Sequence, residues 1–174
     1  MEQIIQLNSQ AKLSEHLASP SEATLSNLSE LNCVRLSPHF SLGEFTKSGS
    51  HPEVYNIPSH EAIANLKRLC GWLEVLRKRA AEPIIINSGY RSPQLNRKIG
   101  GAPTSNHLTG CAADIRVAGM EQALRYAVIL LDYADESKQE FDELLIEKNR
   151  YGAMWVHFAV RPSNNRRKVC FIQT

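Results

Sequence analysis

Apolar side chains recur every three or four residues between positions 60 and 80, which is the spacing of one face of an α-helix. The recurring residues are Ile63, Leu66, Cys70, Leu73 and Leu76. Ser59 stands before this pattern as a candidate N-cap, and Pro83 ends it. A similar spacing runs from Met120 to about Asp135. The pattern predicts two long amphipathic helices, the first reaching from Ser59 to about Ala81.

Runs of β-branched residues and of alternating apolar and polar residues predict strands between and after these helices. The expected strands cover residues 84–87, 112–117, 143–147, 154–160 and 169–173, and brief helices are expected near 41–45 and 93–99. A helix followed by strands mixed with one more helix is typical of an α+β fold. We therefore expect a small, mainly antiparallel sheet with helices packed on one face, its last three strands forming an antiparallel meander.

The first part of the chain differs from the rest. Residues 1–35 contain no glycine and no aromatic residue, and they are rich in serine. Only a weak helical spacing appears there, at Leu25, Leu28 and Leu31. We expect an N-terminal extension of unassigned role at 1–35 and one domain at 36–174.

The composition excludes several classes of protein. Hydrophobic residues make up 43% of the 174 residues and charged residues 22%, and a chain of this size can bury enough surface to fold as a monomer without disulfides. The 20 basic residues nearly balance the 18 acidic ones, which argues against a nucleic-acid partner. No apolar run approaches the roughly 20 residues that span a bilayer, so we expect no membrane insertion.

Two histidines and one aspartate stand out as candidate metal ligands. His107 lies in a long polar segment, seven residues before Asp114. Asp114 interrupts an apolar strand, where alternation directs Ala113 and Ile115 to the core and Asp114 to the other face. His157 occupies the equivalent position in a later strand. The two strands thus each offer one ligand-type side chain, and His107 could reach both from the loop.

Two imidazoles and a carboxylate leave one position open on a tetrahedral zinc, as a catalytic zinc requires. The alternative is a surface aspartate, a loop histidine and a core histidine with no shared role. A helical H-E-x-x-H zinc site is excluded, because His60 and Glu61 are followed by Ala64 at the position of the second histidine.

Three motifs around these residues occur in order along the chain. They are SGYRSPQLN at 88–96, SNHLTGCAAD at 105–114 and WVH at 155–157. Together they resemble the zinc D-Ala-D-Ala carboxypeptidase-like metallopeptidases, whose pattern is S-G-Y-R-S-x-x-x-N, S-x-H-x6-D and a late W-x-H. The resemblance covers about residues 36–171. It implies a Hedgehog/DD-peptidase fold and the hydrolysis of peptidoglycan stem peptides, with carboxypeptidase and endopeptidase chemistry both open.

The resemblance also implies roles for individual residues. Zinc ligands would be His107, Asp114 and His157. Arg91 would face the substrate carboxylate or the developing oxyanion, for which a guanidinium offers a bidentate fork. Ser105 would lie near the substrate peptide, although a serine there can equally cap its own backbone.

The general base is where the sequence departs from better-known members. Many relatives carry an acidic residue three positions before the last histidine, where this chain has Met154. Glu147 is the best substitute, because its strand could pair beside the strand of His157, and Glu143 on the same strand face is the second choice. Both could instead be solvated carboxylates. A non-catalytic zinc-containing module that binds the cell wall, or is purely structural, is therefore the competing hypothesis.

Two further expectations concern the chain's surroundings. The basic turn with Arg161, Arg166, Arg167 and Lys168 is expected to be a solvated hairpin or a contact to an acidic wall polymer.

The opening residues MEQIIQ lack the positive head and apolar stretch of a secretory signal, so we expect a protein that is cytoplasmic as made. A phage or prophage lysis protein released through a membrane pore would reconcile this with a wall substrate.

Overall fold

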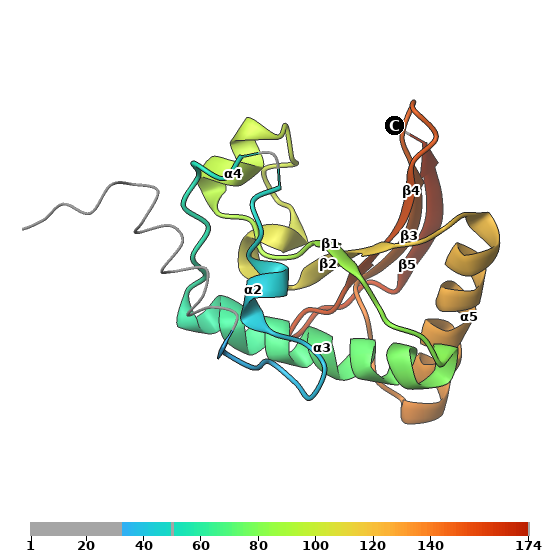
Figure 1. Cartoon of the computed structure of the whole chain (residues 1–174). Helices are drawn as coiled ribbons and strands as arrows, with labels where there is room; N and C mark the ends of the chain where they lie inside the picture. The colour runs from blue at the N-terminus through green and yellow to red at the C-terminus, as the bar shows by residue number, and fades with distance from the viewer. Residues whose placement is uncertain (1–32, 50, 174) are drawn as a thin grey trace, which may run out of the picture.

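The structure, a computed structural model, describes residues 33–49 and 51–173 (Figure 1). Its helices are α2 (Leu42–Phe45), α3 (His60–Ala80), α4 (Pro93–Lys98), the 3₁₀ turn η1 (Asn106–Thr109) and α5 (Met120–Ser137). Its strands are β1 (Ile86–Ser88), β2 (Ala112–Arg116), β3 (Glu143–Lys148), β4 (Met154–Ala159) and β5 (Lys168–Gln173). The predicted helices and strands are confirmed with small shifts at their ends. The weak helix expected around Leu25 to Leu31 lies outside the described residues.

The ends of α3 follow from local chemistry. The Ser59 hydroxyl accepts a hydrogen bond from the backbone N–H of Ala62 at 3.2 Å, which satisfies one of the donors left open in the first turn. Ala81 adopts a left-handed conformation after the last turn, and Pro83 follows two residues later. No helix among the described residues is both long and apolar enough to cross a membrane.

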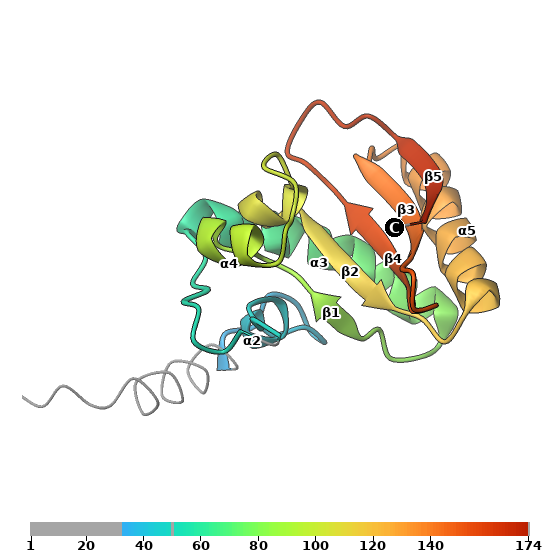
Figure 2. The same ribbon diagram turned by 90° about the horizontal axis from the view of Figure 1, so that it is seen from above.

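The five strands form one mixed sheet in the order β1-β2-β4-β3-β5. Three of the four pairings are antiparallel, and β5 pairs with β3 in parallel. The expected closing meander was wrong. Strand β4 is paired with β2 on one side and β3 on the other, so β5 cannot pair with β4 and lies instead at the outer edge of β3, as Figure 2 shows. Because β5 runs antiparallel to β4, it must run parallel to β3.

Helices α3 and α5 pack on one face of this sheet, as predicted (Figure 1, Figure 2). Trp72 of α3 lies at the centre of the interface, with its ring 4.8 Å from Tyr133, 6.2 Å from Phe141 and 5.3 Å from Phe158, measured between centroids. Val156 and Phe158 of β4 are fully buried on this face. The alternation of a strand sends the intervening residue to the opposite face of the sheet, where the candidate chemistry gathers.

Candidate metal centre

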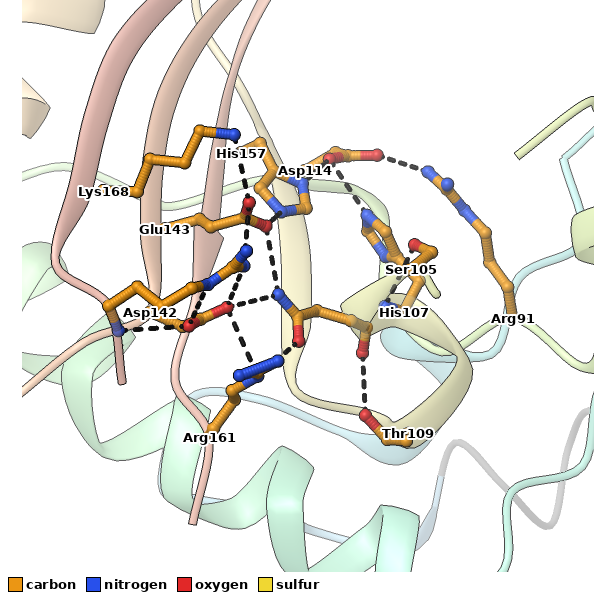
Figure 3. A network of polar contacts seen from close by, with 12 residues as sticks. Arg91, Ser105, His107, Thr109, Asp114, Asp142, Glu143, His157, Arg161 and Lys168 are labelled. Atoms are coloured by element: carbon orange, nitrogen blue, oxygen red, sulfur yellow. Dashed lines mark hydrogen bonds and ion pairs between the residues drawn. The ribbon is translucent and has the colours of Figure 1, made fainter. Parts of the chain in front are cut away.

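The sheet itself brings two of the three predicted ligands together. Asp114 of β2 and His157 of β4 are direct partners in the antiparallel register, so their side chains leave the sheet on the same face. His107 approaches them from η1, the short turn that precedes β2 (Figure 3). All three side chains are buried.

The three ligand atoms are close enough to share one ion. Nε2 of His107 lies 3.2 Å from Oδ1 of Asp114, and Nδ1 of His157 lies 2.9 Å from the same oxygen. The candidate ligand atoms of all three residues lie within 4.8 Å of one another. Bonds of about 2.1 Å in a tetrahedron place ligand atoms about 3.4 Å apart, so the observed separations suit a metal centre.

The tautomer of His107 adds an independent argument for a cation. Its Nδ1 lies 2.6 Å from the carbonyl oxygen of Gly89, which can only accept, so Nδ1 carries the hydrogen. Burial is the largest influence on the pKa of His107 and lowers it, which favours the neutral ring. Nε2 is then an acceptor that faces the acceptor Oδ1 of Asp114. A cation between these two atoms would satisfy both.

The turn that presents His107 is fixed by its own caps. The Ser105 hydroxyl accepts a hydrogen bond from the backbone N–H of His107 at 3.3 Å, which is the capping role expected as one of its two possibilities. Gly110 ends the turn at φ 71°, in the left-handed region. A Cβ on Gly110 would lie 2.5 Å from the carbonyl oxygen of Ala62 in α3, so the close packing of η1 on α3 also requires glycine.

Arg91 contacts the site through Asp114. Its Nη2 lies 2.5 Å from Oδ2 of Asp114, and its Nε donates to the Ser88 hydroxyl at 2.9 Å (Figure 3). The guanidinium therefore holds one carboxylate oxygen of Asp114 and leaves the other to face the histidines. The predicted contact of Arg91 with a substrate remains a prediction, for which Nη1 is the nitrogen outside these two contacts.

The two candidate bases occupy different places around His157. Leu145 of β3 is the direct partner of His157 in the register, and Glu143 and Glu147 flank it on the same face. Oε2 of Glu143 lies 3.5 Å from Nε2 of His157, on the side of the ring away from Asp114. Among the described residues Glu147 forms no ion pair. Glu147 lies opposite Trp155 in the register, two pairs further along the strands than Leu145 and His157.

The position three residues before His157 lies on the sheet face opposite the candidate metal centre. An odd separation along a regular strand reverses the direction of the side chain. Accordingly, Met154 packs against the hydrophobic core on the helix-covered face, whereas His157 faces the site. An acid at position 154 would not reach the metal centre in this strand.

The electrostatics of the centre couple its charged groups. Burial raises the pKa of Asp114, but the histidine contacts hold it well below its usual range, His107 doing so only when its ring is protonated and His157 by donating to the carboxylate. Burial opposes the charge on His157, yet Asp114 and Glu143 raise its pKa to about 9. The hydrogen-bonding contact with His157 is the main cause that lowers the pKa of Glu143 to about 2. Burial raises the pKa of Glu147, with Asp114 adding to the effect and His157 opposing it.

The sequence prediction missed a second group of polar residues beside the centre. The hairpin expected at 161–168 was wrong, because β5 pairs with β3 and not with β4. The turn is largely exposed, as expected, but Arg166 and Arg161 also contact Asp142, whose side chain is fully buried. Asn106, next to His107, contacts Asp142 as well. The only sequence signal was a short acidic stretch, Glu140 to Glu143, at the start of an apolar strand, and nothing in the spacing connects Asp142 to a turn two dozen residues away.

A comparison with protein families shows which family the chain resembles over most of its domain. The family model described as Peptidase M15 matches residues 38–142, well over half of the chain. The match includes Arg91, His107 and Asp114 and ends before β4. No curated protein shows a significant match.

Proposed function

Since the chain belongs to the peptidase M15 family, we propose that it is a zinc-dependent peptidase that hydrolyses the stem peptides of peptidoglycan. The observation that carries this proposal is the convergence of His107, Asp114 and His157 on one face of the sheet, with two hydrogen-bond acceptors facing each other at 3.2 Å. A cation between these two acceptors would satisfy both of them, and membership of the M15 family supports a role for that cation in peptide hydrolysis.

The donor set fits zinc. Two imidazole nitrogens and one carboxylate oxygen are ligands that zinc accepts, and three protein ligands leave a fourth position for water or substrate, as in catalytic rather than structural sites. A zinc ion held by His107, Asp114 and His157 would lower the pKa of a water molecule and polarise a substrate carbonyl. The chain's own residues must supply the remaining steps.

Glu147 is the proposed general base. It shares the sheet face of His157, and burial raises the pKa of its carboxyl toward the pH range in which a base is most effective. Its task is to accept the proton of the attacking water and then to deliver it to the leaving amine. Glu143 is the less suitable base, because its carboxylate already faces Nε2 of His157 and two cationic side chains, Arg166 and Lys168.

Arg91 and Ser105 would act on the substrate. Arg91 uses Nε and Nη2 within the protein, so Nη1 is the group that would bind a substrate carboxylate or the oxyanion that develops on the attacked carbonyl. The Ser105 oxygen accepts from the backbone of His107, which leaves its O–H to donate to a peptide carbonyl.

A non-catalytic zinc-containing module that binds the cell wall is the second candidate. The observation in its favour is Met154, since the acid that many relatives carry at this position is absent and the side chain faces the core. Both candidate functions include bound zinc, but only the peptidase turns over a substrate.

The deciding experiment incubates the zinc-loaded protein with purified muropeptides, with and without a chelator. Zinc-dependent release of D-Ala indicates a carboxypeptidase, and cleavage within the stem indicates an endopeptidase. Glu147→Gln should abolish turnover and retain the metal, while Glu121→Gln on the exposed side of α5 serves as the matched control. Bound zinc without any turnover of the unaltered protein would favour the module, and unchanged turnover of Glu147→Gln would remove Glu147 from its role.

A further inference from the structure

Asp142, the residue directly before Glu143 and the start of β3, carries a fully buried carboxylate. Asp142 has no exposed side-chain surface, and a charge in that position is costly unless it is paired. Arg166 supplies the pairing: its Nε donates to Oδ1 at 2.8 Å, its Nη2 to Oδ2 at 2.6 Å, and its backbone N–H to Oδ1 at 3.2 Å. Arg161 adds an ion pair at 3.4 Å. Asp142 thereby fixes the turn that precedes β5.

The same donors also reach Glu143. Nη2 of Arg166 lies 3.0 Å from Oε1 of Glu143. The amide Nδ2 of Asn106 donates to Oδ2 of Asp142 at 2.7 Å and to Oε2 of Glu143 at 3.0 Å. Two carboxylates are thus held side by side by a shared guanidinium and a shared amide (Figure 3). Their mutual repulsion makes this arrangement unfavourable without those donors.

The held carboxylate faces the metal centre. Oε2 of Glu143 lies 3.5 Å from Nε2 of His157, while Nδ1 of the same ring lies 2.9 Å from Asp114. A carboxylate on one ring nitrogen of a histidine keeps the hydrogen there and directs the lone pair of the other nitrogen to a metal. Arg91 and the carbonyl of Gly89 play the corresponding parts for Asp114 and His107. Every ligand of the centre therefore has an outer partner.

We propose that Glu143 is the positioning residue for His157, and that Asp142, Arg166 and Asn106 act on the metal centre through Glu143 by holding its carboxylate against Nε2 of the ring. This assembly sets the tautomer and the orientation in which His157 offers Nδ1 to zinc. It also ties the turn before β5 to η1, because Asn106 precedes His107 in the chain. The inference deepens the proposed function, since it concerns the same zinc site.

The test measures zinc affinity by competition with a chromophoric chelator, so it needs no substrate. Glu143→Ala should weaken zinc binding by about 10- to 100-fold. Glu143→Gln, which keeps an acceptor oxygen, should lose less than Glu143→Ala. Arg167→Gln is the control, because Arg167 lies beside Arg166 and pairs with Asp135 on the surface. Its zinc affinity should match that of the unaltered protein.

A double-mutant cycle separates positioning from a general structural role. Arg166→Lys keeps a charge beside Asp142 but lacks the planar fork that binds both oxygens of Asp142 while also reaching Glu143. It should weaken zinc binding in the unaltered background and add nothing when Glu143 is already alanine. The visible absorption bands of the cobalt-substituted protein should shift in Glu143→Ala and remain in place in Arg167→Gln, since the bands report the geometry of the ligands.

The outcomes distinguish this inference from the proposed function. Zinc affinity of Glu143→Ala within about twofold of the unaltered protein would overturn the inference, as would an equal effect of Arg166→Lys with and without Glu143, even if the protein cleaves stem peptides. Weakened zinc binding in a protein that cleaves nothing would instead support the inference and reject the peptidase.

Discussion

Nε2 of His107 lies 3.2 Å from Oδ1 of Asp114 without a hydrogen between them, because the ring's hydrogen sits on Nδ1 and is donated to Gly89. Two acceptors at this separation repel each other unless a cation joins them. The chain has thus placed a negative carboxylate and a neutral imidazole where only a metal, or a further proton on His107, relieves the contact. Burial opposes that further proton.

The first prediction follows from this contact: metal should stabilise the fold, and the effect should depend on His107. Zinc present at about 100 times its dissociation constant adds about 2.7 kcal/mol to the free energy of unfolding. We expect thermal unfolding of the chelator-treated protein to shift upward on addition of zinc. His107→Ala should abolish the shift.

The control for this measurement is His60→Ala, which alters an exposed histidine at the first position of α3. It should respond to zinc as the unaltered protein does. A zinc-induced shift that persists in His107→Ala would show that the ion binds elsewhere.

Metal binding should also release a proton from His157. In the metal-free chain Asp114 and Glu143 raise the pKa of this ring to about 9, so it is protonated at pH 7.5. Zinc requires the neutral ring, and its apparent affinity should therefore rise as the pH rises toward 9. Calorimetry in buffers of different ionisation enthalpy measures the release, which should be about one proton per zinc near pH 7.5.

The raised pKa of His157 also determines how the free energy of unfolding of the metal-free protein depends on pH. A pKa raised from 6.5 in the unfolded chain to about 9 in the fold contributes stability that is fully present below pH 6.5 and is lost as the pH rises through 9. His157→Gln should flatten this part of the profile of unfolding free energy against pH. A zinc affinity that does not change between pH 6.5 and 9 would contradict the assignment.

Much of the centre could be predicted from the sequence because its geometry is local. Alternation along β2 and β4 assigned Asp114 and His157 to the face away from the core, and the antiparallel register then made them neighbours. His107 is only seven residues from Asp114, so the turn between them left little choice of position. These positions were predictable because they depend on the strict alternation of strand residues and on a short separation along the chain.

The parts that could not be predicted depend on contacts between distant segments. The pairing of β5 with β3 depends on which edges of β4 are already occupied, and no periodicity reports this. Arg166 reaches Asp142 across 24 residues and Asn106 reaches it across 36. Complementary charge alone does not identify such partners, because a basic turn and a short acidic stretch are each common on solvated surfaces.

Introducing the acid that many relatives carry three residues before the last histidine should not create a better enzyme. Met154 is half-buried against the core and lies opposite Lys148 in the register, so Met154→Glu would move a carboxylate partly out of water and should lower the free energy of unfolding by about 1 kcal/mol. Turnover, measured on muropeptides at a temperature where both proteins are folded, should not increase.

Met154→Leu is the matched substitution, and a volume-conserving apolar exchange should cost less than about 1.5 kcal/mol. A gain in turnover in Met154→Glu alone would show that this side chain can reach the site, and would overturn the assignment of Met154 to the core face.

The turn that carries His107 should fail when Gly110 gains a side chain. A non-glycine residue in the left-handed region costs about 1–2 kcal/mol, and at Gly110 the new Cβ would also lie 2.5 Å from the carbonyl oxygen of Ala62. Because α3 cannot yield without disturbing the core, η1 must move and carry His107 with it. Gly110→Ala should therefore lower both the free energy of unfolding and the zinc affinity.

Gly100→Ala separates the two causes, since Gly100 has nearly the same φ of 72° and no atom within 4 Å of the position of a Cβ. It should show the backbone cost alone, with zinc affinity unchanged. Comparing the two variants by chemical denaturation and by chelator competition isolates the effect of the contact with Ala62. Equal losses of stability in both, with zinc affinity retained in both, would mean that the packing of η1 on α3 does not position His107.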